Sequence, residues 1–564
     1  MTSVSCSCRP PRSRLRTCIS PDGGFICAFH RSSLNAINLR ETRALSILGK
    51  TDTGEDVVNS ANFPDGDVAF PPSTGVYEIP NPFPFWGATY ILQGPADLFR
   101  EDPSTFRFIK RKTSEADNPL LKELLRGSLT GSDGRTFSIS DLPCEVLLAL
   151  AQTSRDPMLL EAIAGLVCDF LLDETGSLAG IRFTTAEGKR PVRSIQDHLL
   201  YETLGNNPAL PDRYKRAMLL VPGIQGESPI LGEYRAAGTH VWEYVRANSY
   251  IPWGHYAANM AEDSIRYQAR DLSASDMTGL RHLYYQRVVC QMAAALGIPV
   301  ERTDGKGLSP SSLESMREKV LETIRRRIET GERIPFTGTL WGWNYGYDIS
   351  PSLYRLHASH QQIHQQYALI PPDVAPVEEG CPLVPTYAIG DQVADFVRRY
   401  REDTGRSFFE AYLDAIRSNK RLDGRTDLPS NLVLFEDDYV VAHVPKAQRS
   451  QGEIQIMVKK PVGNVLEADE ATRSSLDMAI LRVIHTLDAL GAEMVTCYEV
   501  SKRFDALDSD QRLFLCLLPR HFKSPGAFSE RQERWITGHY PEDYAEAARL
   551  AYDSICKSRR GEDS

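Results

Sequence analysis

Between residues 119 and 223, apolar residues recur at the three-to-four spacing of amphipathic helices. The pattern is carried by the segments LLKELLRGSL, DLPCEVLLALAQTS, DPMLLEAIAGLVCDFLLDE and SIQDHLLYETLG. One hairpin is expected around IRFTTAEGKRP. We predict a helical domain over residues 119–223, with a supporting or partner-binding role because it has no cluster of catalytic residue types.

From about residue 232 the pattern changes to strand, turn, long helix and strand. THVWEYVRANSYIPWGHYAANM alternates in period two around a Pro-Trp-Gly turn and predicts a hairpin. LSASDMTGLRHLYYQRVVCQMAAALG begins like a capping box at Ser273 and closes with Gly297, so it predicts a long helix. The charged residues 301–333 predict an inserted, exposed helix before the stretch that begins TLWGWNYG.

The same order recurs in the C-terminal half of the chain. NLVLFEDDYVVAHVPKA and GEIQIMVKK are rich in strand formers, and DEATRSSLDMAILRVIHTLDALG is again a long amphipathic helix that ends at a glycine. EMVTCYEVSKRFDALDSDQRLFLCLLPR then predicts two strands joined by a polar loop. The two halves share element order more than letters, so we predict an α+β fold with an internally duplicated antiparallel sheet and long helices.

The rest of the chain lies around these units. An Arg- and Ser-rich start predicts a disordered or non-native tail, and a region rich in Asp, Gly, Pro and aromatic residues predicts irregular structure or short strands. A Pro-rich linker and one helix, near residues 391–419, separate the two halves. The predicted units are residues 1–48 (tail), 49–118 (irregular), 119–223 (helical), 232–371 (first repeat), 372–429 (linker and helix), 430–522 (second repeat) and 523–564 (C-terminal helical tail).

Composition narrows the classes of partner. The 564 residues are 42% hydrophobic and 24% charged, as in multidomain globular proteins. A net charge of −10 disfavours a nucleic-acid polymer as partner and leaves room for a small anion in a local basic pocket. No uninterrupted apolar run of about 18 residues predicts a membrane span. The 11 scattered cysteines are expected to be reduced thiols of a cytoplasmic protein.

Three of the 12 histidines, His357, His360 and His364, fall within eight residues. In a strand, alternation would place His360, Gln362, His364 and Gln366 on one face, which offers a nucleophilic imidazole among neutral donors that could stabilise a reacting phosphoryl group. In a helix, His360 and His364 would be four apart on one face and could bind a metal, with His357 one turn earlier. The pattern alone leaves both alternatives open.

The surrounding residues resemble a known family. Asn344-Tyr345-Gly346, the small residues Ser350 and Ser352, and Gln362-Ile363-His364-Gln365-Gln366 follow one another. This order is similar to the galactose-1-phosphate uridylyltransferase branch of the histidine-triad-like superfamily, which carries His-x-His-x-Gln after Asn-x-Gly and a small-residue turn. Gly254-His255 resembles the Gly-His at the end of the family's first hairpin. The resemblance spans about residues 232–371 and, more faintly, 430–520.

The resemblance implies a two-step nucleotidyl transfer, phosphorolysis or hydrolysis of a nucleoside diphosphate compound, such as a nucleotide sugar or a dinucleoside polyphosphate. His364 would form the covalent nucleotidyl intermediate, and Gln366 would hold the phosphoryl oxygens. The other expected site residues are His360 and Gln362 beside the nucleophile, and Asn344, Gly346, Ser350, Ser352, His255 and Trp343 in substrate binding. Trp343 is expected either to stack on a base or to pack at the sheet edge. We expect no cofactor, no metal and a homodimer.

Two departures keep other functions open. Gln362 stands where the family has its first histidine, and Pro371 lies seven residues after His364 rather than the five of the short members. Counting back five reaches Gln366, which would make the protein a non-catalytic nucleotide-binding or scaffold protein. A metal-dependent hydrolase on His357, His360 and His364 is a third hypothesis, which the lack of Asp and Glu from residue 354 to 372 disfavours. The second repeat has no histidine in its matching strand, residues 511–519, and is expected to be structural.

Overall fold

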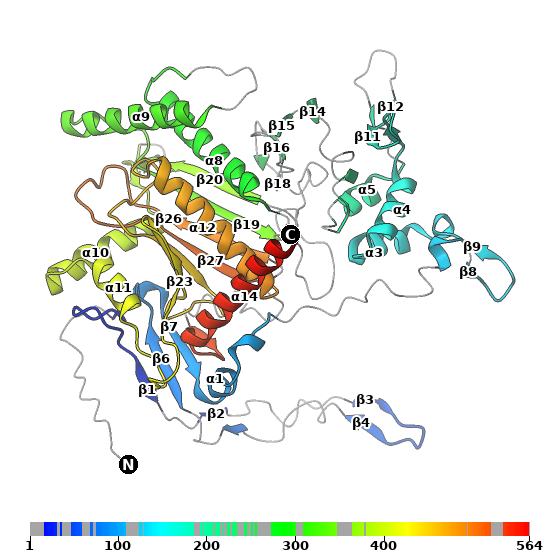
Figure 1. Ribbon diagram of the computed structural model, residues 1–564, viewed down its shortest axis with the longest axis horizontal. Coiled ribbons are helices and arrows are strands. Elements are labelled where there is room, and N and C mark those ends of the chain that lie inside the picture. The colour runs from blue at the N-terminus through cyan, green and yellow to red at the C-terminus, as the bar shows by residue number, and fades with distance from the viewer. Residues whose placement is uncertain are drawn as a thin grey trace.

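The computed structural model describes most of the chain. The described residues are 16–30, 34–36, 47–58, 68–70, 75–108, 123–127, 129–184, 192–193, 196–205, 207, 209–211, 213–214, 217, 223–225, 228–233, 242–244, 250–251, 254–255, 272–300, 308–346, 364–376, 380–492, 494–520 and 534–562. Their fold is α+β, with mainly antiparallel sheets and helices packed against them (Figure 1).

A seven-stranded antiparallel sheet forms the centre of the molecule, in the order β20-β19-β26-β27-β25-β24-β23. Its strands are β19 (Gly338–Gly346), β20 (His364–Ile370), β23 (Val433–Glu436), β24 (Val440–His443), β25 (Ile454–Val458), β26 (Met494–Val500) and β27 (Phe514–Arg520). The strands β19 and β26 are neighbours near one edge of the sheet, with Gly342 opposite Tyr498. Segments far apart in the chain therefore share one hydrogen-bonded surface.

Long helices lie on one side of this sheet. Those that contact its strands are α8 (Ala274–Ala295), α12 (Glu470–Ala489) and α14 (Pro541–Glu562), and α9 (Pro310–Thr330) packs against α8. Figure 1 shows α12 in front of the sheet between α8 and α14. Alternate strand residues, among them Trp343, Val495, Cys497 and Leu515, point to this side and join the larger hydrophobic core. Helix α9 is the charged insertion that the sequence predicted between the long helix and β19.

The opposite face carries a second hydrophobic core. Helices α10 (Ile389–Thr404) and α11 (Phe408–Arg417) pack there with the hairpin of β6 (Val76–Pro80) and β7 (Ala88–Leu92). The ring of Phe83 stacks on that of Phe514, with centroids 5.4 Å apart. The single helix expected near residues 391–419 is wrong. Gly405, at φ 73°, ends α10, and the Ser407 side chain caps α11.

The expected N-terminal tail does not hold for residues 16–30. Cys18 and Ile19 are buried in the second core, and β1 (Ala28–His30) pairs with β6. Strand β28 (Arg534–Thr537), near the other end of the chain, pairs in parallel with β7. Apolar side chains in the Arg-rich start thus become ordered because distant segments supply their contacts.

The remaining elements are shorter. Between residues 34 and 141 they are β2 (Leu34–Ala36), β3 (Ile47–Lys50), β4 (Asp56–Val58), β5 (Val68–Phe70), η3 (Pro84–Trp86), α1 (Gln93–Arg100), η4 (Pro103–Thr105), β8 (Leu129–Thr130), β9 (Thr136–Phe137) and η5 (Ile139–Asp141). The region predicted as helical contains α3 (Cys144–Thr153), α4 (Pro157–Val167), α5 (His198–Gly205) and the strands β10 (Phe170–Leu172), β11 (Leu178–Ile181), β12 (Phe183–Thr184) and β13 (Val192–Arg193). The pair β12–β13 is the hairpin predicted there.

Further short strands lie in and around the first repeat, outside the central sheet. They are β14 (Gly223–Gln225), β15 (Ser228–Glu233), β16 (Trp242–Tyr244), β17 (Tyr250–Ile251), β18 (Gly254–His255), β21 (Asp373–Val374) and β22 (Val384–Pro385). The order helix, strand, strand occurs twice, as α8-β19-β20 and as α12-β26-β27. The internal duplication itself stays a prediction.

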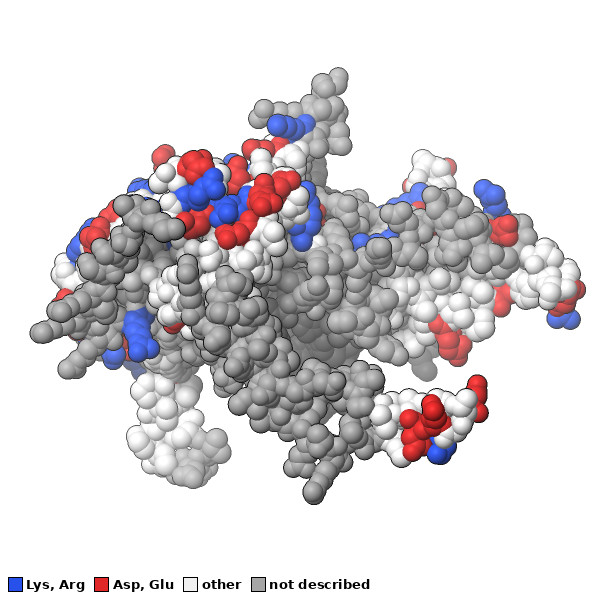
Figure 2. Space-filling model, turned by 90° about the horizontal axis from the view of Figure 1, so that it is seen from below, with Lys and Arg blue, Asp and Glu red and all other residues white. Residues whose placement is uncertain are grey.

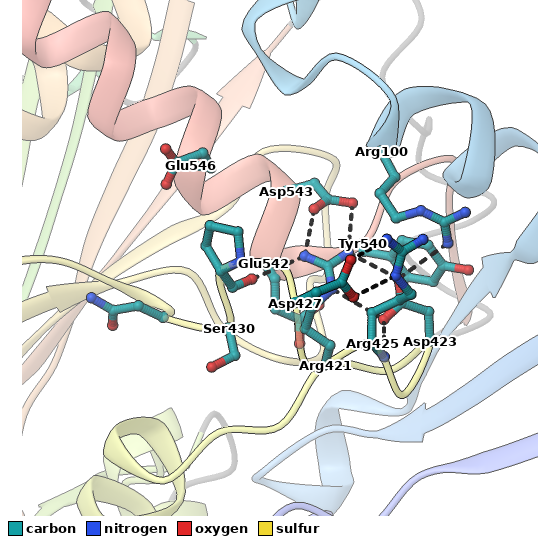
Figure 3. Close-up of polar contacts among 12 residues, drawn as sticks. Arg100, Arg421, Asp423, Arg425, Asp427, Ser430, Tyr540, Glu542, Asp543 and Glu546 are labelled. Atoms are coloured by element: carbon teal, nitrogen blue, oxygen red, sulfur yellow. Dashed lines mark hydrogen bonds and ion pairs between the residues drawn. The ribbon is translucent and has the colours of Figure 1, made fainter.

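A buried polar network ties α1, the loop after α11 and α14 together (Figure 3). Arg421 lies between two carboxylates and donates to Asp543 at 2.6 Å and to Asp423 at 3.0 Å. Arg100 also donates to Asp423, at 3.1 Å. Beside them, Lys446 forms an ion pair with Glu542, and both side chains are at most 1% exposed. Such pairs hold elements in register, because a buried charge without its partner is costly.

The described surface mixes both signs of charge. On the face shown in Figure 2, acidic and basic side chains are interspersed over the described residues. Exposed ion pairs such as Arg398–Glu402 and Arg326–Glu332 are part of this mixture. In the part of the chain that the structure describes, no helix is both long enough and apolar enough to span a bilayer.

Candidate functional site

The histidine at position 364 lies at the start of a strand. Strand β20 begins at His364 and pairs with β19 so that His364 is opposite Asn344 and Gln366 is opposite Gly342. At the described end of the histidine cluster, His364 therefore has strand conformation, and the metal hypothesis for the three histidines stays a prediction. His357 and the rest of the segment up to residue 363 lie outside the described residues.

The tryptophans of β19 identify the face of the sheet that the helices cover. Trp341 and Trp343 are 3% and 2% exposed and pack under the helices. Tyr367 of β20 packs on the same side, where its hydroxyl accepts a hydrogen bond from Arg287 at 2.8 Å. Trp343 is thus a core residue and the expectation that it contacts substrate is wrong, because strand alternation turns it to the helix-covered face. Even-numbered positions of both strands belong to the other face.

Several described positions on that other face are exposed at this edge of the sheet. Leu340 is 45% exposed, Gln366 and Ala368 are exposed, and Gly342 and Tyr498 are half-buried. We call this surface the open strip, which consists of Leu340, Gly342, Gln366, Ala368, Thr496 and Tyr498. In the neighbouring strands the same face is buried under the second core, as at Phe514 and Cys516. Because the open strip is accessible and lies beside the residues expected to be catalytic, we take it as the candidate ligand-binding surface.

One end of the open strip is closed by an ion pair. Arg503 donates to the two carboxylate oxygens of Asp391 at 2.8 and 2.7 Å and to the Thr337 hydroxyl at 2.9 Å. Its Cδ lies 3.3 Å from where a Cβ of Gly338 would be. The strip thus ends at the first residue of β19 and continues toward positions 344 and 364.

Buried polar side chains form a hydrogen-bonded series that begins at Tyr498. The Arg449 guanidinium donates to the Tyr498 hydroxyl, lies 3.8 Å from the Trp86 ring centroid, and pairs with Glu453. Burial raises the pKa of Tyr498 well above its ordinary value, so its phenol stays neutral.

This hydrogen-bonded series includes three further side chains. Gln455 donates to Glu453 at 2.9 Å, and the Tyr412 hydroxyl lies 3.3 Å from the Gln455 amide oxygen and 3.2 Å from Nε2 of His443. Desolvation lowers the pKa of His443 to about 3, which keeps this imidazole neutral. This series of hydrogen-bonded side chains therefore fixes the position of Tyr498 without adding a free charge to the open strip.

A second buried cluster supports β19 from the helix side. Arg281 of α8 donates to Asp477 of α12 at 2.9 Å and lies 4.3 Å from the ring centroid of Trp341. Glu499 of β26 is 5% exposed. Desolvation raises its pKa to about 7, and Arg281 opposes part of that shift. Glu499 is therefore a carboxyl whose charge changes near neutral pH.

Glu499 makes stability depend on pH. Its folded-state pKa of about 7 exceeds its ordinary value of 4.5, so between these values the folded protein binds more protons than the unfolded chain and stability falls as pH rises. From pH 4.5 to 7, wild type should lose up to about 3 kcal/mol more than Glu499→Gln, at about 1.4 kcal/mol per pKa unit. Urea unfolding of both proteins at several pH values measures this, and parallel curves would contradict it.

The residues predicted from sequence separate into three groups. Asn344 and Gly346 lie on β19, and His364 and Gln366 lie on β20, so the ladder brings these positions together. His255 lies on β18, which pairs with β17 outside the central sheet, as the predicted hairpin requires. The predicted residues His360, Gln362, Ser350 and Ser352 lie outside the described residues. Within the described ranges, no group of three or more His, Cys, Asp and Glu side chains could hold a metal.

Sequence reasoning missed Leu340, Gly342 and Tyr498. The alternation in Leu340-Trp341-Gly342-Trp343 carried a signal, since it places both tryptophans on one face and a glycine on the other. The residue opposite that glycine, Tyr498, follows only from the pairing of β19 with β26.

Comparisons with known proteins give a weak resemblance in fold. No family model matches the chain, and no curated protein matches it. A solved structure of a GALT-like protein from Arabidopsis thaliana is 16% identical over 43% of this chain and 69% of its own, with a TM-score of 0.28. An ADP-glucose phosphorylase from the same plant, solved with bound ADP-glucose, is 16% identical over 43% and 66%, with a TM-score of 0.28. A uridylyltransferase is 13% identical over 44% and 69%, with a TM-score of 0.31.

Proposed function

We propose that this protein is a nucleotidyl transferase or phosphorylase that acts on a nucleoside diphosphate compound through a covalent nucleotidyl-His364. The observation that carries the proposal is the register of β20, which brings His364 opposite Asn344 on the face whose neighbouring positions form the open strip. A nucleophile at an accessible edge of a rigid sheet can meet a phosphorus atom while its strand holds it in place.

The reaction would take place in two displacements. In the first, an imidazole nitrogen of His364 forms a bond to the α-phosphorus while the bond from that phosphorus to the bridging oxygen breaks, and the leaving group departs as a sugar phosphate or nucleotide. In the second, an oxygen of phosphate, a sugar phosphate or water attacks the same phosphorus and His364 leaves. Splitting one displacement into two is what a histidine nucleophile contributes.

Neighbouring residues have defined roles in this proposal. Gln366, two residues along the same strand, is exposed on the open strip and would donate to the non-bridging oxygens. Asn344, opposite His364, would orient the site. His360 and Gln362 would assist from the preceding residues, and the second repeat would be structural in an internally duplicated fold. The cytoplasmic location and the homodimer remain predictions.

The stereochemistry at phosphorus tests the proposal. With an α-thio nucleotide sugar of one configuration, and phosphate or a sugar phosphate as acceptor, two displacements should give a product with retained configuration, because each step inverts the phosphorus. Phosphorus NMR of the product distinguishes the isomers. Inversion would mean direct transfer without a nucleotidyl-histidine. Binding of nucleotide sugars of all bases without any turnover would favour the alternative of a non-catalytic nucleotide-binding protein.

A further inference from the structure

The open strip is apolar at one end and polar at the other. Its first rung, Ala368 opposite Leu340, is apolar, and the next contains Gln366, Gly342 and Tyr498. A third rung carries positions 364 and 344 together with Thr496. Rungs on one face are about 7 Å apart, so an apolar end and a polar end lie within reach of one small molecule.

Gly342 has no packing reason to be a glycine. Its φ is not positive, and its pairing with β20 and β26 is regular, without a bulge. Among the described atoms, a Cβ there would meet only the Cys497 carbonyl oxygen at 3.7 Å and the Tyr498 Cβ at 4.0 Å, which are ordinary contacts. At Gly390, by contrast, it would lie 2.0 Å from the Ser501 carbonyl oxygen. A strand glycine that is explained by neither a positive φ, nor a bulge, nor crowding by neighbouring atoms indicates that a ligand approaches the backbone closely.

Glycine leaves a slot between two side chains. Gln366 and Tyr498 lie on either side of Gly342, two strand spacings or about 10 Å apart. The two atoms nearest to the Cβ position do not belong to the Tyr498 ring, so the ring does not cover the glycine. We call the position over Gly342 the slot, and exposed Leu340 continues it on the apolar side.

The hydroxyl of Tyr498 is engaged by a buried side chain. The buried guanidinium of Arg449 binds the hydroxyl, and Glu453 and the ring of Trp86 hold that guanidinium in turn. Tyr498 is half-buried as a residue and its polar end is already satisfied, so the part of it that reaches the surface would act as an apolar wall. Flat aromatic ligands suit such a wall, whereas phosphates and sugars need donors and acceptors.

We propose that the slot over Gly342 binds the nucleobase of the substrate, stacked against Tyr498 and one rung away from His364. This inference rests on the proposed function, whose reacting phosphorus it places at the polar end of the open strip. Base recognition is then shared between β19 and β26, two strands from different halves of the chain.

Equilibrium binding of nucleoside monophosphates to the full chain, with ribose 5-phosphate as a probe that lacks a base, tests the slot. Gly342→Val should fill it and Tyr498→Ala should remove its wall, and each should weaken nucleotide binding about tenfold or more. Binding of ribose 5-phosphate should change less than threefold. Tyr498→Phe keeps the ring and should bind nucleotides within about threefold of wild type.

The outcomes separate this inference from the nucleotidyl-histidine. Gly342→Val should fold with unchanged or higher thermal stability, since valine favours strands over glycine, so lost binding would not reflect unfolding. Nucleotide binding that is unchanged in Gly342→Val and Tyr498→Ala would overturn the slot even if His364 forms an adduct, as would a wild type that binds no nucleotide. Lost binding in both variants would support the slot even if no adduct forms.

Discussion

Replacing Glu542 by Ala is expected to lower the free energy of unfolding by about 3–5 kcal/mol. Glu542 is fully buried and pairs with Lys446, whose side chain is 1% exposed. The Lys446 ammonium also donates to Asn419 at 2.8 Å and to the Lys420 carbonyl at 2.7 Å. Removing the carboxylate leaves a buried positive charge without its counter-ion. Urea denaturation monitored by circular dichroism measures the loss.

The same helix offers a matched control. Glu546 lies one turn further along α14, apart from the cluster (Figure 3), and pairs with Arg549 at a partly exposed position. Glu546→Ala should cost at most about 1 kcal/mol, because exposed pairs contribute little. The double variant Lys446→Met/Glu542→Leu should recover most of the stability lost in Glu542→Ala. Equal losses at both glutamates would show that the buried pair does not hold α14 in place.

Replacing His364 by Ala is expected to lower turnover of the nucleotide substrate at least about 1,000-fold, as the loss of a covalent nucleophile does elsewhere. Equilibrium binding of nucleoside monophosphates should stay within about tenfold of wild type, because the slot over Gly342 is unaltered. Initial rates and binding measured on the same preparation separate the two effects.

His30→Ala is the matched control for this substitution. His30 lies on β1 and is an exposed histidine that pairs with Glu78. Its removal should leave turnover unchanged and cost little stability. A His364→Ala protein that is folded and retains turnover within tenfold of wild type would contradict the nucleophile and favour a non-catalytic role for the histidine.

Local patterns predicted the second half of the chain well, because its elements are long and its periods clear. The helix expected to close at Gly491 is observed as α12, Glu470–Ala489, and the two strands after it are β26 and β27. The helix predicted over residues 272–297 is α8, Ala274–Ala295. A sustained apolar stripe with capping residues at its ends defines such elements without tertiary information.

The site depended on contacts that no local pattern contains. Tyr498 belongs to the open strip only because β26 pairs with β19. Lys446 pairs with Glu542, which lies 96 positions further along the chain. Trp343 has an aromatic ring of the kind that stacks on bases, yet the alternation of side chains along β19 places it in the core. Cys18 and Ile19 lie in a stretch with the composition of a tail and are buried by elements from the far half of the chain.

Intact-protein mass spectrometry tests the central claim most directly. Wild type and His364→Ala are each incubated at neutral pH with nucleotide sugars of the four bases and quenched without acid. The account predicts that wild type alone gains the mass of one nucleoside monophosphate and loses it on acid treatment, as a phosphorus–nitrogen bond should. A wild type that turns over a nucleotide sugar without ever gaining this mass, or an adduct that persists on His364→Ala, would contradict it.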